Sequence, residues 1–113
     1  MQAFVVDHLK KDELERLRGI IKDFAYPSAL DDIFWIPIPE HLLTPTQAAH
    51  KECQPHFFAV EFGEDFISFE FLARTHQRIR CDCISPATPQ QKVYLLELAK
   101  EIFAKAEVEM KSH

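Results

Sequence analysis

Residues 56–84 read HFFAVEFGEDFISFEFLARTHQRIRCDCI, and this stretch decides the predicted fold. Large apolar side chains alternate with polar ones, as in strands that bury one face. The pattern predicts three consecutive antiparallel strands near residues 56–62, 65–73 and 77–84. The side chains predicted to share the buried face are Phe58, Val60, Phe62, Ile67, Phe69, Phe71, Ile79, Cys81 and Cys83.

The register of the first hairpin follows from parity, because a one-residue slip would turn the apolar side chains toward solvent. A two-residue loop, either Gly63-Glu64 or Glu64-Asp65, keeps the face continuous, and a three-residue loop does not. We expect Gly63-Glu64, since glycine suits the first central position of a type II′ turn. The same reasoning at the second connection sets Glu70 opposite Arg80 as a cross-strand ion pair.

The remaining segments predict three helices and one further strand. Leucine and isoleucine at three- and four-residue steps indicate a helix over residues 8–25, with Asp7 as its N-cap. Two Thr-Pro-x-Gln motifs open helices over 45–53 and 89–110, because threonine caps and proline suits the first helical position. Residues 33–38 predict an edge strand, since proline cannot donate to a neighbouring strand.

Together these elements predict an α+β fold with the order α-β-α-β-β-β-α. It is a two-layer sandwich in which an antiparallel meander and an edge strand pack against N- and C-terminal helices. The chain has 113 residues, of which 47% are hydrophobic and ten are phenylalanine. That amount of apolar surface suits one core, so residues 1–113 are expected to form a single domain.

Charge and cysteine content narrow the class of function. The formal net charge of −5 gives no basic face for nucleic-acid phosphates, so we expect no nucleic-acid binding. No apolar run approaches the roughly 20 residues that span a bilayer, and the first residues lack the features of a signal peptide. Three cysteines, an odd number, fit a reduced compartment better than a disulfide framework. We therefore expect a cytoplasmic protein without membrane contact.

A group of histidines and cysteines is the sharpest candidate for chemistry. The residue types that zinc binds occur at His50, Cys53, His56, Cys81 and Cys83. Their spacing matches no common zinc motif, and alternate residues of a regular strand hold their Cβ atoms about 6.6 Å apart. Zinc binding is therefore an alternative, and the expectation is a protein purified without zinc and without any other cofactor.

Catalysis by a cysteine is not favoured either. A thiolate nucleophile needs exposure and a neighbouring base, and the buried face denies exposure to Cys81 and Cys83. Cys53 at the C-terminus of a helix lies at the negative end of the helix dipole, which raises a thiol pKa. We expect the protein not to be an enzyme.

A local basic stripe is a further candidate, as a site for a carboxylate or phosphate. It consists of Arg74, His76, Arg78 and Arg80. Acidic neighbours on the same predicted face favour the interpretation of a solvated charge ladder.

The function favoured by the sequence is a small non-enzymatic binding or assembly domain that forms a homodimer. The outer face of the predicted sheet is only half polar, and an apolar patch of this kind is often covered by a second copy. The predicted interface residues are Trp35, Phe57, Phe66, Leu72 and Ile84. The alternatives are a metal- or thiol-dependent protein and an acidic adaptor that resembles secretion chaperones in size and charge.

Overall fold

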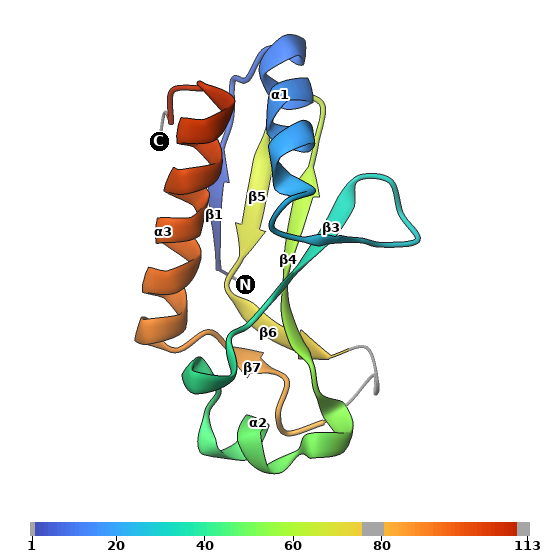
Figure 1. Cartoon of the computed structure of the whole chain (residues 1–113), viewed down its shortest axis with the longest axis vertical. Helices are drawn as coiled ribbons and strands as arrows, with labels where there is room; N and C mark the ends of the chain where they lie inside the picture. Colours follow the sequence, from blue (N-terminus) through green and yellow to red (C-terminus); the bar gives the residue numbers. More distant parts are fainter. Residues whose placement is uncertain (1, 76–80, 111–113) are drawn as a thin grey trace.

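The structure is a computed structural model, and it describes residues 2–75 and 81–110. It confirms the α+β class, with an antiparallel sheet and helices near both ends of the chain (Figure 1). The strands are β1 (Ala3–Val6), β2 (Tyr26–Pro27), β3 (Ile33–Pro37), β4 (His56–Phe62), β5 (Ile67–Glu70), β6 (Leu72–Thr75) and β7 (Ser85–Pro86). The helices are α1 (Lys11–Ile21), α2 (Pro45–Ala49) and α3 (Pro89–Ala106), with 3-10 turns η1 (Glu40–Leu42) and η2 (Lys51–Cys53).

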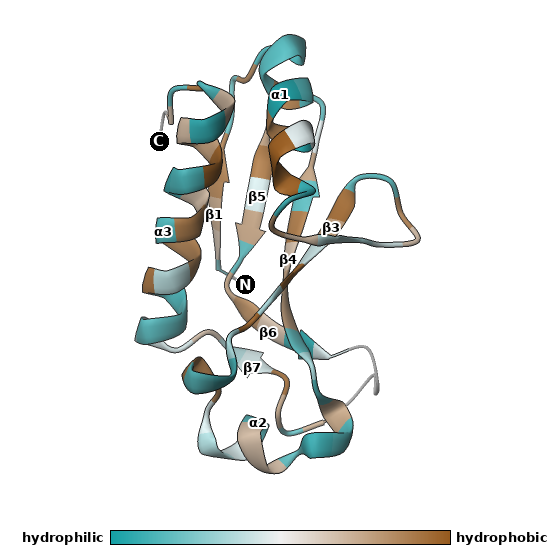
Figure 2. Cartoon of the chain, viewed as in Figure 1, coloured by the Kyte–Doolittle hydropathy of each residue, from teal (hydrophilic) through white to brown (hydrophobic). Residues whose placement is uncertain are grey.

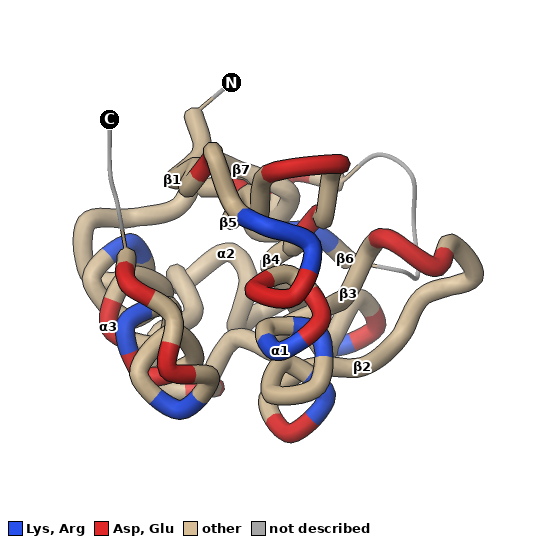
Figure 3. Tube along the Cα trace, turned by 90° about the horizontal axis from the view of Figure 1, so that it is seen from above, with Lys and Arg blue, Asp and Glu red and all other residues tan. Residues whose placement is uncertain are grey.

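The sheet has the strand order β1-β5-β4-β3-β2, and β6 and β7 extend it beyond the first half of β4. Helices α1 and α3 pack beside each other on one face of this sheet, as the view from above shows (Figure 3). The arrangement is the predicted two-layer sandwich. The other face of the sheet carries no helix among the described residues.

The core lies between the helices and the sheet. The predicted face of the first hairpin is confirmed, because Phe58, Val60, Phe62, Ile67 and Phe69 are all buried. Figure 2 shows that β1, β4 and β5 are largely hydrophobic and that α1 and α3 carry both hydrophobic and hydrophilic residues. The helical side chains buried against this face are Leu14, Leu17, Ile21, Leu95, Ala99, Ile102, Phe103 and Ala106.

The loop of the first hairpin differs from the expected one by a single position. Phe62 pairs with Ile67, and the Gly63 N–H donates to the Phe66 carbonyl over 2.8 Å, so the two loop residues are Glu64-Asp65. Gly63 also does not adopt a positive φ, so the type II′ reasoning is wrong. Glycine is needed there for another reason, since a Cβ atom would overlap the Phe66 ring.

The predicted second strand is broken into β5 and β6. Val60 of β4 pairs with Phe69, whereas Phe57 pairs with Arg74, so three steps along β4 oppose five along its partner. The two extra residues act as a bulge, which bends the strand, and Phe71 at the break is only partly buried. As a result β6 diverges from β5 and runs toward β7 at the end of the molecule that holds α2 (Figure 1).

The predicted third strand over 77–84 is not a strand in its described part, residues 81–84. Residues 77–80 lie outside the described part of the chain, together with the predicted core residue Ile79 and the predicted ion-pair partner Arg80. Residues 81–84 form a turn in which the Ile84 N–H donates to the Cys81 carbonyl over 3.0 Å. The strand that follows this turn and pairs with β6 is the two-residue β7, and Cys83 is buried without belonging to a strand face.

Other boundaries differ by a few residues. Helix α1 begins at Lys11, and the Lys10 N–H is capped by Glu13 over 2.9 Å, so Asp7 is not the N-cap. Helix α3 ends at Ala106 because Glu107 takes a left-handed conformation. The predicted 45–53 helix is α2 followed by η2.

The short strands β1 and β2 lie at the two ends of the strand order. Strand β1 was not among the predicted elements, and it pairs along β5 with Phe4 opposite Phe69. Strand β3 is second from the edge, because β2 pairs with Phe34 and Trp35. The predicted edge strand over 33–38 is therefore not at the edge where β2 pairs with it, and only its end at Pro37, beyond the residues paired with β2, lacks that neighbour.

Candidate metal centre

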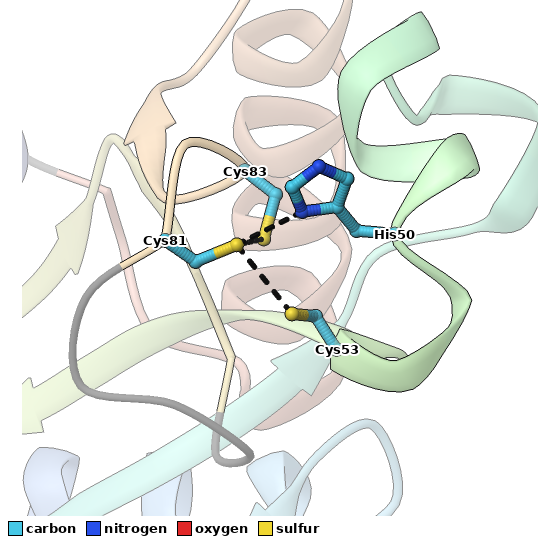
Figure 4. Close-up of side chains that lie close together, drawn as sticks. All are labelled: His50, Cys53, Cys81 and Cys83. Atoms are coloured by element: carbon cyan, nitrogen blue, oxygen red, sulfur yellow. Dashed lines mark hydrogen bonds between the residues drawn. The ribbon is translucent and has the colours of Figure 1, made fainter.

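Four of the five predicted metal ligands converge at the α2 end of the molecule. The ligand atoms of His50, Cys53, Cys81 and Cys83 all lie within 4.8 Å of one another (Figure 4). Cys81 is central: its Sγ is 2.9 Å from His50 Nδ1, 3.5 Å from Cys53 Sγ and 3.1 Å from Cys83 Sγ. Cys53 and Cys83 are fully buried, and the other two are partly exposed.

The cluster is assembled from two arms of the chain. His50 ends α2, and the Cys53 N–H donates to the His50 carbonyl over 3.0 Å, so both side chains leave one compact turn. The other arm is the turn that contains Cys81 and Cys83. The arms meet because they flank the paired strands β4 and β6, and the Thr75 hydroxyl of β6 donates to the Cys53 carbonyl.

Two buried glutamines hold the second arm in place. The Gln47 amide donates to the Cys83 carbonyl over 3.0 Å, and the Gln91 amide donates to Gln47 Oε1 over 3.1 Å and to the Leu42 carbonyl over 2.9 Å. Both side chains are 0% exposed. The predicted capping of the two Thr-Pro-x-Gln motifs is confirmed, since each threonine hydroxyl accepts from its glutamine N–H over 3.1 Å. The contact between the two motifs was not predicted.

The three thiols have different acidities. A backbone N–H and the thiol of Cys83 both donate to Cys81, and these bonds lower the pKa of Cys81 to about 6. Burial raises the pKa of Cys83 to about 12, and burial is also the main cause of the raised pKa of Cys53. Hydrogen bonds to a thiolate and loss of solvent are the ordinary causes of such opposite shifts.

The arrangement fits a tetrahedral Cys₃His centre. Zn–S bonds of about 2.3 Å and Zn–N bonds of about 2.0–2.1 Å place tetrahedral ligand atoms about 3.5–3.8 Å apart. The three separations from Cys81 Sγ, 2.9–3.5 Å, lie within about 1 Å of these values, and the other pairs of ligand atoms lie within 4.8 Å of each other. The geometric reason for expecting no zinc is wrong, because Cys81 and Cys83 lie in a turn and not on a regular strand. The zinc content itself stays a prediction.

His56 is the fifth predicted ligand, and it does not join the cluster. Its side chain is 1% exposed, and neither ring nitrogen has a hydrogen-bond partner among the described residues. Burial lowers the pKa of His56, with a smaller contribution from His50, and this keeps the ring neutral.

The predicted basic stripe can be placed at one residue only. His76, Arg78 and Arg80 lie outside the described residues. Arg74 donates to both carboxylate oxygens of Glu70, over 2.6 and 3.2 Å, and this bond raises the arginine pKa. Arg74 therefore has a partner within the chain.

The predicted interface residues do not form one exposed patch. Phe57 is buried, and its ring lies 6.4 Å from the rings of both Trp35 and Tyr26. Phe66, Leu72 and Ile84 are partly buried. An open trough of about 390 Å³ instead follows the sheet face opposite the helices. It is lined by Ala3, Leu30, Ile33, Trp35, Ala59, Glu61, Ser68, Glu70 and Arg74.

Comparisons with protein-family models, curated proteins and solved structures found no match to this chain. Within residues 2–75 and 81–110, no helix combines the length and apolar character needed to cross a bilayer.

Proposed function

We propose that the protein is a zinc-binding α+β domain in which a Cys₃His centre stabilises the α2 end of the fold. The convergence of one imidazole and three thiols from two separate arms supports this proposal. Four protein ligands complete the tetrahedral shell, which is typical of structural zinc sites and leaves no position for a substrate. The proposed role is therefore structural.

Zinc would compensate for a weakness of this region. Strand β7 has two residues and α2 has five, so neither buries much apolar surface. Structural zinc contributes its binding free energy to folding, because the ligands are not arranged in the unfolded chain. Binding would displace the protons of Cys53 and Cys83, whose raised pKa values keep them protonated at neutral pH without metal. Thiols must stay reduced for this role, so we also propose a cytoplasmic location.

Elemental analysis tests the proposal directly. Protein purified with zinc and a reductant should carry about one zinc per chain after gel filtration, and a chelator should lower its melting temperature. Cobalt(II) titration should produce the visible absorption of tetrahedral thiolate coordination. Cys83→Ser and His50→Ala should each lose most of the bound metal. The matched control is His41→Ala, which removes an exposed histidine outside the cluster and should keep full stoichiometry.

Two results would refute the proposal. One is wild-type protein that neither retains zinc nor binds cobalt after complete reduction of its thiols. The other is equal metal content in the wild type, Cys83→Ser and His50→Ala, because this would place the metal elsewhere.

A second candidate function is assembly as a homodimer through the trough. Five of its nine lining residues are apolar, and it lies on the face that the helices leave uncovered. A second copy would cover this surface. Sedimentation equilibrium should give a dimer that Trp35→Arg dissociates. Val93→Arg, at an exposed apolar position on α3, should leave the dimer intact. A monomer mass at high micromolar concentration would reject this candidate.

A further inference from the structure

The three sulfur atoms of the candidate centre form a chain with Cys81 in the middle. Its Sγ contacts Cys83 Sγ at 3.1 Å and Cys53 Sγ at 3.5 Å. Cys81 is partly exposed, whereas both neighbours are 0% exposed. A small oxidant in solvent can therefore reach Cys81, and a second thiol is already in contact with it.

We propose that the cluster is a site of reversible thiol oxidation, in which a hydroperoxide oxidises Cys81 and Cys53 then completes a disulfide. In the first step the Cys81 thiol loses its proton and the thiolate attacks the peroxide. The O–O bond breaks, that proton goes to the departing oxygen, and the products are a sulfenic acid and an alcohol or water. In the second step the Cys53 sulfur attacks the Cys81 sulfur. The S–O bond breaks, a disulfide forms, and the Cys53 proton leaves with the hydroxide as water. Two electrons pass from the thiols to the peroxide.

Cys53 is assigned as the second thiol because of where each neighbour sits in the chain. Cys81 and Cys83 share a tight turn closed by the bond from Ile84 N–H to the Cys81 carbonyl. A disulfide within that turn would have to distort it, since disulfides require a limited range of Cα separations and dihedral angles. Cys53 approaches from η2 on the other arm and has no such restriction from the turn.

Release of zinc is the second part of the inference, and it rests on the proposed function. A Cys53–Cys81 disulfide removes two of the four ligands and leaves His50 and Cys83. Two ligands do not hold a structural zinc ion, so oxidation would release it. A dithiol reductant would break the disulfide by exchange, become oxidised itself and restore the site.

The disulfide is tested on metal-free protein, so that this result does not depend on zinc. Reduced wild-type protein, stripped with a chelator, is treated with one equivalent of hydrogen peroxide and its free thiols are counted. The count should fall from three to one, and mass spectrometry should identify a Cys53–Cys81 cross-linked peptide that a dithiol removes. Cys83→Ser should form the same cross-link, whereas Cys53→Ser should not. A Cys81–Cys83 cross-link, a sulfinic acid at Cys81 without a disulfide, or three unreacted thiols would each overturn the assignment.

Zinc release is measured separately on metal-loaded wild-type protein with a chromogenic chelator. One zinc should appear per disulfide formed. A disulfide without zinc release from loaded protein would overturn the coupling. Protein that binds no zinc would refute the proposed function and the release step, while the thiol count on metal-free protein would still decide the oxidation step.

Discussion

Substitution of Gln91 by methionine isolates the buried contact between the two capping motifs. The side-chain length is kept and the amide is removed. Gln91 donates to the Leu42 carbonyl at 2.9 Å and to Gln47 Oε1 at 3.1 Å, and it accepts from the Thr88 N–H at 3.0 Å. A buried polar group that loses its partner costs about 1–3 kcal/mol, and two of these three partners lie away from the helix end. We expect Gln91→Met to lower the free energy of unfolding by about 2–4 kcal/mol.

The assay is urea unfolding followed by circular dichroism, with chelator and again with saturating zinc. Gln90→Met is the matched control, because Gln90 is the exposed neighbour on the same helical turn and its change should stay within about 0.5 kcal/mol. A double-mutant cycle with Gln47→Met should give a coupling energy of at least about 1 kcal/mol. If Gln91→Met and Gln90→Met unfold at the same urea concentration, the glutamine contact contributes nothing and the reasoning is refuted.

Three further changes probe other parts of the fold. Phe69→Ala should cost about 3–5 kcal/mol in urea unfolding, because the side chain is 0% exposed, and a loss under about 1 kcal/mol would contradict the core assignment. His56→Phe should be neutral or stabilise by up to about 2 kcal/mol, since it removes two nitrogens that have no hydrogen-bond partner among the described residues. In the wild type, stability should fall as pH falls from about 6.5 toward the lowered pKa of His56 in the folded state, because the unfolded chain binds the proton more readily. His56→Phe should lack this loss, and melting temperatures of both proteins across that pH range test it. Gly63→Ala should cost about 1 kcal/mol by displacing the Phe66 ring, and the cost should vanish in a Phe66→Ala background.

The face of the central hairpin could be predicted because strand parity is a strict constraint. Phe58, Val60, Ile67 and Phe69 had to share one side whichever two-residue loop joined the strands. The position of the loop could not be predicted from the glycine preference of turns. Glycine is required at position 63 because the Phe66 ring leaves no room for a Cβ atom, and not because the backbone has a positive φ. Turn propensity therefore predicts a two-residue loop beside Gly63 but places it one position too early.

The sequence pattern does not favour convergence of the thiols, because its alternation predicts one regular strand through Cys81 and Cys83. The break between β5 and β6 depends on pairing with β4, which is tertiary information. A usable signal was nevertheless present. His50-x-x-Cys53 directly precedes the hairpin and Cys81-x-Cys83 comes after it, and antiparallel pairing brings the two flanks of a hairpin together.

Helix α3 makes contacts at both ends of the molecule, and this affects which local unfolding events expose its amide groups. Its 18 residues span about 27 Å at 1.5 Å per residue, along a molecule whose longest extent is 41 Å. Its first turn is tied through Gln91 to the α2 region, and its last turn accepts a bond from Arg16 of α1 to the Ala106 carbonyl at 3.0 Å. Amide protons at the two ends of one helix should therefore exchange with solvent through different opening events. If the proposed zinc centre forms, loss of the metal would accelerate exchange in the first turn, and the last turn would continue to report global unfolding.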